Sequence, residues 1–170
     1  MRHIFIMNPK AGKRDQTGSI YTMAEALREK HGLRVDCFLT ERPGGAIEMA
    51  RKLAETGEEI RVYACGGDGT VNEVANGLAG FPNAAMTCIP TGTGNDFLKN
   101  FGPDAARFAD VENLCNYSPR NRNGLYKLCY GMYGRDSGTE NFCGKGRRSP
   151  VLYGTASGTG TVLYLYEKKL

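Results

Sequence analysis

The 170-residue sequence predicts an α/β domain with a largely parallel sheet, followed by a tail of different composition. Over the first hundred residues, short apolar runs alternate with segments of helical periodicity, which is typical of a parallel sheet covered by helices. Residues 1–116 hold 13 Lys and Arg against 15 Asp and Glu, whereas residues 117–170 hold 9 against 3. We therefore expect a folded domain over 1–116 and an incomplete or atypical tail over 117–170.

Four apolar runs predict the strands of the sheet. Each run is bounded by Gly, Pro, Asn or charged residues, which are depleted inside strands and enriched in turns. The predicted strands are residues 3–7, 33–39, 60–65 and 84–88.

Three other segments predict helices, because their apolar residues recur at i, i+3, i+4 and i+7. The loops that follow the strands are where we expect function, since parallel sheets place ligand sites at the carboxyl ends of their strands. The helical stripes are Ile20, Met23, Ala24 and Leu27, then Ala46, Ile47, Ala50, Leu53 and Ala54, and finally Val71, Val74, Ala75 and Leu78.

The composition argues against several classes of protein. No apolar run approaches the roughly 18 residues of a membrane span, and the N-terminus lacks the apolar core of a signal peptide, so we expect a cytoplasmic protein. The six cysteines form no C-x-x-C pair, which argues against zinc, and Cys37, Cys65 and Cys88 are expected to be reduced core residues. The basic tail could attract nucleic acid or an anionic membrane. A basic tail with little structure has the same composition, and we expect no specific nucleic-acid partner.

The third predicted strand runs directly into Gly-Gly-Asp-Gly-Thr-Val-Asn-Glu, residues 66–73. Its glycines are expected to adopt positive φ angles and to let a ligand approach the backbone. Thr70 and Glu73 have the spacing of a capping box, so a helix N-terminus is expected beside the glycine turn, where phosphate binds. An ordinary tight turn is the alternative, but it leaves the carboxylate of Asp68 unexplained. We interpret Asp68 as a ligand of Mg²⁺, directly or through water.

Two further loops follow predicted strands. Residues 8–13, Asn-Pro-Lys-Ala-Gly-Lys, place two lysines beside a glycine, which suits phosphate oxygens, although a plain loop explains them equally well. Residues 89–97, Ile-Pro-Thr-Gly-Thr-Gly-Asn-Asp-Phe, repeat the combination of glycines and a helix start, with Thr93 and Asp96 at capping-box spacing. Two glycine-rich loops at equivalent strand ends indicate a binding site. No Gly-Lys-Ser/Thr follows the glycines, so the site is not a Walker P-loop.

In order and approximate spacing, these three motifs resemble the catalytic domain of the diacylglycerol kinase family, and within it the small soluble bacterial lipid kinases. The resemblance covers residues 1–115. Gly-Gly-Asp-Gly-Thr alone also occurs in NAD kinases and, in variant form, in phosphofructokinases, whose nucleotide-binding fold the family shares. The continuation over residues 71–77 and the loop at 90–97 indicate the lipid kinases.

The resemblance implies a Mg²⁺-dependent kinase that transfers the γ-phosphoryl group of ATP to a lipid hydroxyl, such as that of diacylglycerol, at the membrane surface. An NAD-kinase-like or sphingosine-kinase-like enzyme, a non-catalytic nucleotide-binding module and a homodimer stay open. Thr40 enters through the resemblance alone. The implied nucleotide-binding residues are Asn8, Lys13, Thr40, Gly66, Gly67, Asp68, Gly69, Thr70, Val71, Asn72 and Thr93, with Asp68 nearest to the metal.

The tail departs from the family. In the family, the general base is a glutamate that belongs to a second, β-rich domain, as do most carboxylates that bind Mg²⁺, and no residue here matches that base. Residues 117–170 instead hold seven of the nine tyrosines and nine glycines, with fragments of the expected sequence at 123–126 and 138–140. We hypothesise that the coding frame shifts near residue 125; a truncated or divergent tail is the alternative. A strand-rich continuation in another frame, with a later glutamate, is the expected result of reading the gene.

Overall fold

The computed structural model describes residues 1–81, 83–99 and 102–116, and there it has the predicted α/β architecture. The four predicted strands are all present, and their ends lie within two residues of the predicted ones. The three predicted helices are also present. The elements in chain order are β1 (Arg2–Met7), α1 (Thr17–His31), β2 (Arg34–Leu39), α2 (Gly45–Ala54), β3 (Ile60–Gly66), α3 (Asp68–Leu78), β4 (Ala84–Pro90), α4 (Asp96–Lys99), the 3₁₀ helix η1 (Gly102–Ala109) and α5 (Val111–Asn116).

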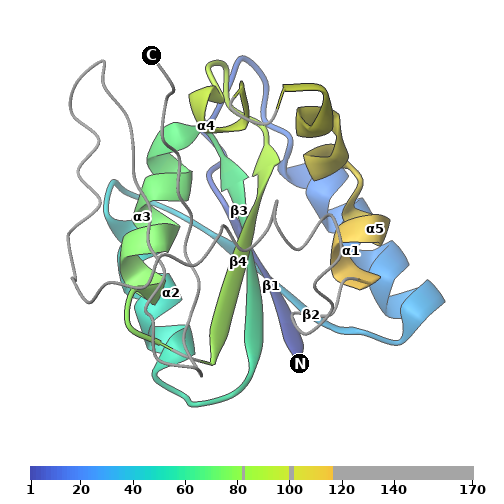
Figure 1. Ribbon diagram of the computed structural model, residues 1–170, viewed down its shortest axis with the longest axis vertical. Helices are drawn as coiled ribbons and strands as arrows, with labels where there is room; N and C mark the ends of the chain where they lie inside the picture. Colours follow the sequence, from blue (N-terminus) through green and yellow to red (C-terminus); the bar gives the residue numbers. More distant parts are fainter. Residues whose placement is uncertain (82, 100–101, 117–170) are drawn as a thin grey trace.

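The strands of the described residues form one sheet in the order β2-β1-β3-β4, and every neighbouring pair is parallel. Met7 pairs with Leu39 on one side and with Cys65 on the other, and Cys65 pairs with Ile89, so the strands end level with one another. Figure 1 shows these carboxyl ends at the upper edge of the sheet, beside α4. The loops after the strands therefore leave from one edge.

Helices cover both faces of the sheet. In Figure 1, α2 and α3 lie on one side, and α1 and α5 lie on the other. The strands β1 and β3 are central and almost completely buried, which explains their continuous apolar sequences. The predicted stripes face inward, with buried residues Ile20, Ala24, Leu27, Ala46, Ala50, Leu53, Ala54, Val71, Val74, Ala75 and Leu78.

The helices α2 and α3 pack closely because of a glycine. A Cβ atom on Gly77 would lie 2.6 Å from the carbonyl oxygen of Ile47 and 2.7 Å from the Cβ of Ala50. Real Cβ atoms do not approach backbone this closely, so any larger residue at position 77 would push the two helices apart. The spacing between α2 and α3 is therefore set by this glycine.

Three polar side chains, those of His3, Arg61 and Tyr63, lie together on the face of the sheet away from α2 and α3 (Figure 1). By their register, His3, Phe5, Arg61 and Tyr63 share one face. The Nδ1 atom of His3 lies 2.9 Å from the Tyr63 hydroxyl, and the rings of Phe5 and Tyr63 stack with centroids 4.4 Å apart. The Arg61 guanidinium donates to the carbonyl oxygens of Leu114 and Cys115 at 2.7 and 3.0 Å. Arg61 thereby fastens the end of α5 to the sheet.

The predicted state of the first three cysteines is confirmed. Cys65 and Cys88 are buried free thiols, Cys37 is a half-buried one, and burial raises the pKa of the Cys65 thiol well above its ordinary value. Across the residues that the structure describes, no helix is long and apolar enough to cross a membrane. The tail over 117–170, with its predicted second-domain fragments and frame shift, lies outside the described residues.

Candidate functional site

Three loops meet at the carboxyl edge of the sheet, at the top of Figure 1. The N–H of Asn8, just after β1, donates to the carbonyl oxygen of Cys65 at 2.9 Å. The N–H groups of Thr91 and Gly92, just after β4, donate to the carbonyl oxygen of Gly66 at 3.3 and 3.2 Å. The structure thus brings together the loops that follow β1, β3 and β4.

The glycines of the loop after β3 do not serve the purpose that the sequence predicted. We expected positive φ angles, but Gly66, Gly67 and Gly69 all lack them, so that expectation is wrong. Close packing explains two of the loop glycines instead. A Cβ on Gly66 would lie 2.2 Å from the Thr70 hydroxyl oxygen, and a Cβ on Gly92 would lie 2.4 Å from the Cα of Gly67. Gly92 lets the loops after β3 and β4 touch backbone to backbone, and Gly66 leaves room for the Thr70 side chain.

Gly69 differs from these neighbours. Nothing lies within 4 Å of the position that its Cβ would occupy, and the residue is exposed. Neither its φ angle nor its packing against the protein requires a glycine here. Gly69 is also one of the residues that line the pocket described below.

The predicted capping box of Thr70 and Glu73 is wrong. The helix α3 begins three residues earlier than the capping box implies, at Asp68, with Gly67 as its N-cap and no side-chain cap. Glu73 instead accepts hydrogen bonds from the N–H groups of Gly44 and Ala46, at 2.9 and 3.1 Å. Glu73 therefore binds the N-terminus of α2, which lies beside α3, and does not cap the N-terminus of its own helix.

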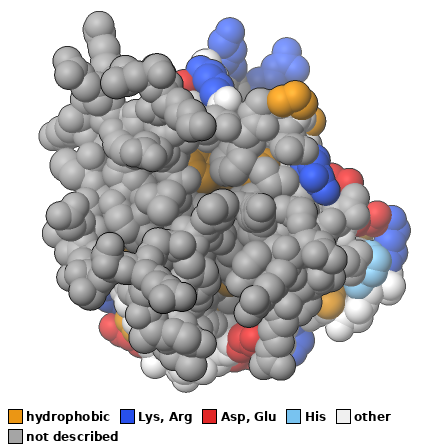
Figure 2. Space-filling model, in the orientation of Figure 1, with side chains coloured by type: hydrophobic (Ala, Val, Ile, Leu, Met, Phe, Trp, Pro, Cys, Tyr) orange, Lys and Arg blue, Asp and Glu red, His pale blue; other side chains and the backbone are white. Residues whose placement is uncertain are grey.

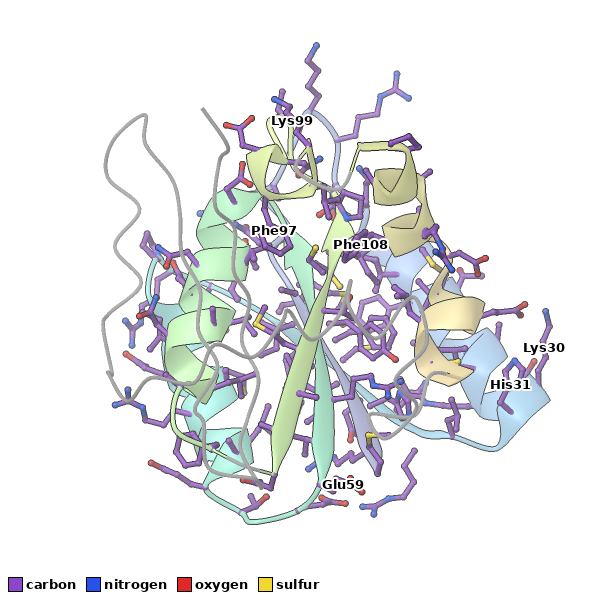
Figure 3. The ribbon with its side chains drawn as sticks, viewed as in Figure 1. Lys30, His31, Glu59, Phe97, Lys99 and Phe108 are labelled. Atoms are coloured by element: carbon purple, nitrogen blue, oxygen red, sulfur yellow. The ribbon has the colours of Figure 1, made fainter. Side chains whose placement is uncertain are left out.

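The second predicted capping box, Thr93 with Asp96, is also wrong. The helix α4 begins at Asp96, and the carboxylate that caps it belongs to Asp68. Asp68 accepts from the N–H of Asp96 at 3.0 Å and from the N–H of Phe97 at 2.9 Å. Figure 3 shows Phe97 and Lys99 at this end of the molecule, with Glu59 at the opposite end. Asp68 therefore has a structural role that the sequence did not suggest.

A pocket of about 280 Å³ opens between the first turn of α3 and the segment that joins β2 to α2. Of the predicted nucleotide-binding residues, Asn8, Thr40, Gly69 and Thr70 line it. The side-chain amide of Asn8 reaches the Thr70 hydroxyl at 3.4 Å. The other lining residues are Lys10, Glu41, Arg42, Pro43, Ala46 and Glu73.

The remaining predicted nucleotide-binding residues do not line this pocket. Lys13 and Thr93 are exposed, and Gly66 and Val71 are buried. Gly67, Asp68 and Asn72 are half-buried, and the Asn72 side chain accepts from Asn76 on the next turn of α3.

Within the wall formed by residues 40–46, residues 41–43 and Ala46 were not predicted as site residues, and Thr40 was predicted only through the family resemblance. The segment follows β2 just as the motif loops follow their own strands, and that position was the available signal. Its glycine pair at 44–45 has no hydroxyl residue next to it, so no local pattern marked the segment. Lys10, three residues before the predicted Lys13 in the same loop, is the lysine that lines the pocket.

Charges of both signs surround the pocket. Lys10 and Arg42 contribute cations, and Glu41 and Glu73 contribute carboxylates. Arg42 donates to both oxygens of Glu48 at 2.8 and 2.7 Å, and this hydrogen bonding raises the pKa of Arg42. Figure 2 shows Lys and Arg side chains at the upper end of the molecule, above the carboxyl edge of the sheet. Of the two cations that line the pocket, Arg42 is paired with Glu48, so Lys10 is the one more open to an anionic group.

The described residues hold no cluster of three or more His, Cys, Asp or Glu that could bind a metal ion. Asp68 is a single carboxylate, and each of its oxygens already accepts one N–H. Mg²⁺ is commonly held by one or two carboxylates together with phosphate oxygens and waters. The predicted role of Asp68 as a partner of Mg²⁺ stays a prediction.

Comparison with known proteins decides the family. The family model described as diacylglycerol kinase catalytic domain matches residues 2–121. The chain belongs to the diacylglycerol kinase catalytic domain family. A diacylglycerol kinase of Staphylococcus saprophyticus is 39% identical over 93 residues, covering 54% of this chain and 30% of that protein. One from Staphylococcus aureus strain MRSA252 is 39% identical over 93 residues, covering 54% and 29%.

The fold agrees with this diacylglycerol kinase family. The crystal structure of a diacylglycerol kinase from Bacillus anthracis superposes with a TM-score of 0.51 at 30% sequence identity, and the match covers 68% of this chain and 39% of that one. The chain therefore spans about a third of the length of these relatives. The predicted α/β fold class and the predicted family are both confirmed.

Proposed function

We propose that residues 1–116 are the ATP-binding half of a lipid kinase that transfers the γ-phosphoryl group of ATP to a lipid hydroxyl, such as that of diacylglycerol. The observation that carries this proposal is Gly69, an open glycine in the first turn of α3 that lines the pocket. Membership of the diacylglycerol kinase family supports the reaction class. The two other candidate classes, a kinase for a different acceptor and a non-catalytic module, share the same nucleotide site.

A glycine in a helix is less favourable than alanine by about 1 kcal/mol. At Gly69 the protein itself gives no reason for that cost, since a Cβ would meet nothing within 4 Å. A ligand that occupies the open space does give one, because it can then approach the backbone of the first turn. The N-terminus of α3 carries unpaired N–H groups and roughly half a positive charge, which favours phosphate there.

The pocket residues supply the further contacts that a nucleotide needs. Asn8 and Thr70, joined by their side chains, offer an amide and a hydroxyl, and Lys10 offers a cation for phosphate oxygens. Thr40 lies on the opposite wall. When bound, Mg²⁺ would neutralise charge on the phosphates, with Asp68 as its protein partner through water.

The role of this domain in the reaction is to hold the donor. Phosphoryl transfer relies on positioning the γ-phosphoryl group and on neutralising its charge. Proton removal from the lipid hydroxyl requires a base, which we assign to a second domain of the kind that the family resemblance implies. We place the protein in the cytoplasm, where it would meet its lipid at the membrane surface.

Calorimetric titration with Mg·ATP tests the nucleotide site. Gly69→Leu fills the open space, and Gly18→Leu is a matched control because Gly18 is also the second residue of a helix with nothing within 4 Å of its Cβ position. We expect Gly69→Leu to weaken binding by about tenfold or more with little change in melting temperature, and Gly18→Leu to change neither. Equal affinity of Gly69→Leu and the wild type would exclude this turn as the phosphate site.

The acceptor is tested separately. Labelled ATP is offered to the full chain with vesicles that contain diacylglycerol, with sphingosine vesicles, or with NAD. Transfer to diacylglycerol alone supports the proposed reaction, and transfer to another acceptor would replace it. Binding of Mg·ATP without transfer to any acceptor is the result expected of an ATP-binding half on its own, because the base is assigned to a second domain.

A further inference from the structure

Glu73 joins the two walls of the candidate pocket. It lies on the second turn of α3, it is half-buried, and it lines the pocket. Its Oε1 accepts from the N–H of Gly44 at 2.9 Å, and its Oε2 accepts from the N–H of Ala46 at 3.1 Å. Both donors belong to the N-terminus of α2, which is 27 to 29 residues away along the chain.

The helix α2 depends on this carboxylate because it has no cap of its own. Its N-cap is Gly44, which has a φ of 81° and no side chain that could accept a hydrogen bond. The first N–H groups of a helix need acceptors, and a negative charge beside them is favourable. Glu73 provides both from a neighbouring helix.

The hydrogen bonds of Glu73 to Gly44 and Ala46 connect the two walls of the pocket, so they affect its shape. Gly77 lies one helical turn after Glu73 and brings α3 against Ile47 and Ala50 of α2, so the two helices are held together at successive turns. The segment before α2 is folded back by a hydrogen bond from the N–H of Gly45 to the carbonyl oxygen of Arg42, at 3.0 Å. The wall that carries Thr40 and Ala46 is thus fixed to the helix that carries Gly69 and Thr70.

We propose that Glu73 is a positioning residue, which sets the width of the nucleotide pocket by holding residues 40–46 against α3. Its two hydrogen bonds to α2 leave it suited to this role and not to that of a general base. The inference rests on the proposed function only for the identity of the ligand. The two hydrogen bonds between Glu73 and the N-terminus of α2 are present in the protein without ligand.

The test uses the full chain with three substitutions. Glu73→Ala removes both acceptors, and Glu73→Gln retains one. Leu53→Ala is the control, since Leu53 is a buried residue of α2 that does not line the pocket, and its truncation lowers stability through a cavity. Two quantities are measured for each variant well below its melting temperature: the Kd for Mg·ATP and the hydrogen exchange of the Gly44 and Ala46 amides.

We expect Glu73→Ala to raise the Kd by about tenfold and to speed exchange of the two amides by a similar factor, with Glu73→Gln in between. Leu53→Ala should leave the Kd within about twofold of the wild type. The proposal is overturned if Glu73→Ala binds as tightly as the wild type, or if Leu53→Ala raises the Kd equally. If the wild type itself does not bind Mg·ATP, the proposed function fails. The amide exchange then still decides whether Glu73 holds the wall.

Discussion

The Oδ1 atom of Asp68 accepts a hydrogen bond from the backbone N–H of Phe97 across 2.9 Å. Its Oδ2 atom accepts from the N–H of Asp96 at 3.0 Å, so one carboxylate caps the short helix α4 and ties it to the start of α3. The same residue was predicted from the sequence as a partner of Mg²⁺, and that assignment stays a prediction. Any variant at Asp68 will therefore affect structure as well as nucleotide chemistry.

We expect Asp68→Ala to lower the free energy of unfolding by about 1 to 2 kcal/mol, because two helix N–H groups lose their acceptor. Asp68→Asn should lose less, since its amide oxygen can still accept one of the two hydrogen bonds. Urea denaturation of both variants measures the difference. An Asp68→Ala variant as stable as the wild type would show that the cap contributes nothing to the fold.

Gly92→Ala is expected to destabilise the protein by about 2 kcal/mol or more, because its Cβ would lie 2.4 Å from the Cα of Gly67 and 2.8 Å from its nitrogen. These two nearest atoms belong to the backbone of Gly67, which cannot move aside as the end of a flexible side chain can. Gly18→Ala is the control, since its Cβ meets nothing, and it should be neutral or stabilising by up to about 1 kcal/mol. Thermal unfolding of the two variants tests the prediction, which fails if their melting temperatures agree.

Arg61→Met is expected to cost about 2 to 3 kcal/mol, because the buried carbonyl groups of Leu114 and Cys115 lose a charged donor. The exposed ion pair of Lys30 with Glu112 also connects α1 to α5, but water screens it. Lys30→Ala should therefore leave the free energy of unfolding nearly unchanged. Chemical denaturation distinguishes the two contacts, and equal effects would mean that burial does not decide their strength.

The stability of the protein should fall as the pH falls from about 6.5 to about 4. Burial, together with the smaller effect of the Arg61 charge, lowers the pKa of His3 from 6.5 to about 4. The unfolded chain then binds a proton in this window that the folded protein does not, so acidification favours unfolding, by on the order of 2 kcal/mol in total.

The measurement is the free energy of unfolding at several pH values for the wild type and for His3→Gln. The glutamine can keep a hydrogen bond to the Tyr63 hydroxyl but does not titrate. The slope of stability against pH between 4 and 6.5 should decrease in this variant. An unchanged slope would assign the acid sensitivity to other groups.

The fold was largely predictable because its signals are local. Apolar runs such as residues 60–65 and stripes such as Val71 with Val74 repeat at the periods of a strand and a helix, and burial of one face follows directly. The four strands and three long helices were therefore located to within a few residues. The register and strand order were not predicted, since they depend on which distant runs pair.

The candidate site was predicted less completely. Asn8, Gly69 and Thr70 belong to local motifs, and Thr40 came from a family resemblance; all four line the pocket. The wall at residues 41–43 had no motif of its own, so only the chain path places it there. The glycines were recognised as significant, but the expected reason, a positive φ angle, was wrong for residues 66–69.

By itself, the sequence determined the alternation of strands and helices, the family, and the edge of the sheet at which function is expected, because each of these depends on neighbours within a few positions. Tertiary structure alone decided the partners of Asp68 and Glu73. Glu73 was predicted to cap its own helix and Asp68 to serve Mg²⁺, yet the hydrogen-bond donors of both carboxylates lie 27 to 29 residues away. A carboxylate binds whichever unpaired N–H groups the fold brings near, and the packing of α2 and α4 against the start of α3 brings helix N-termini there.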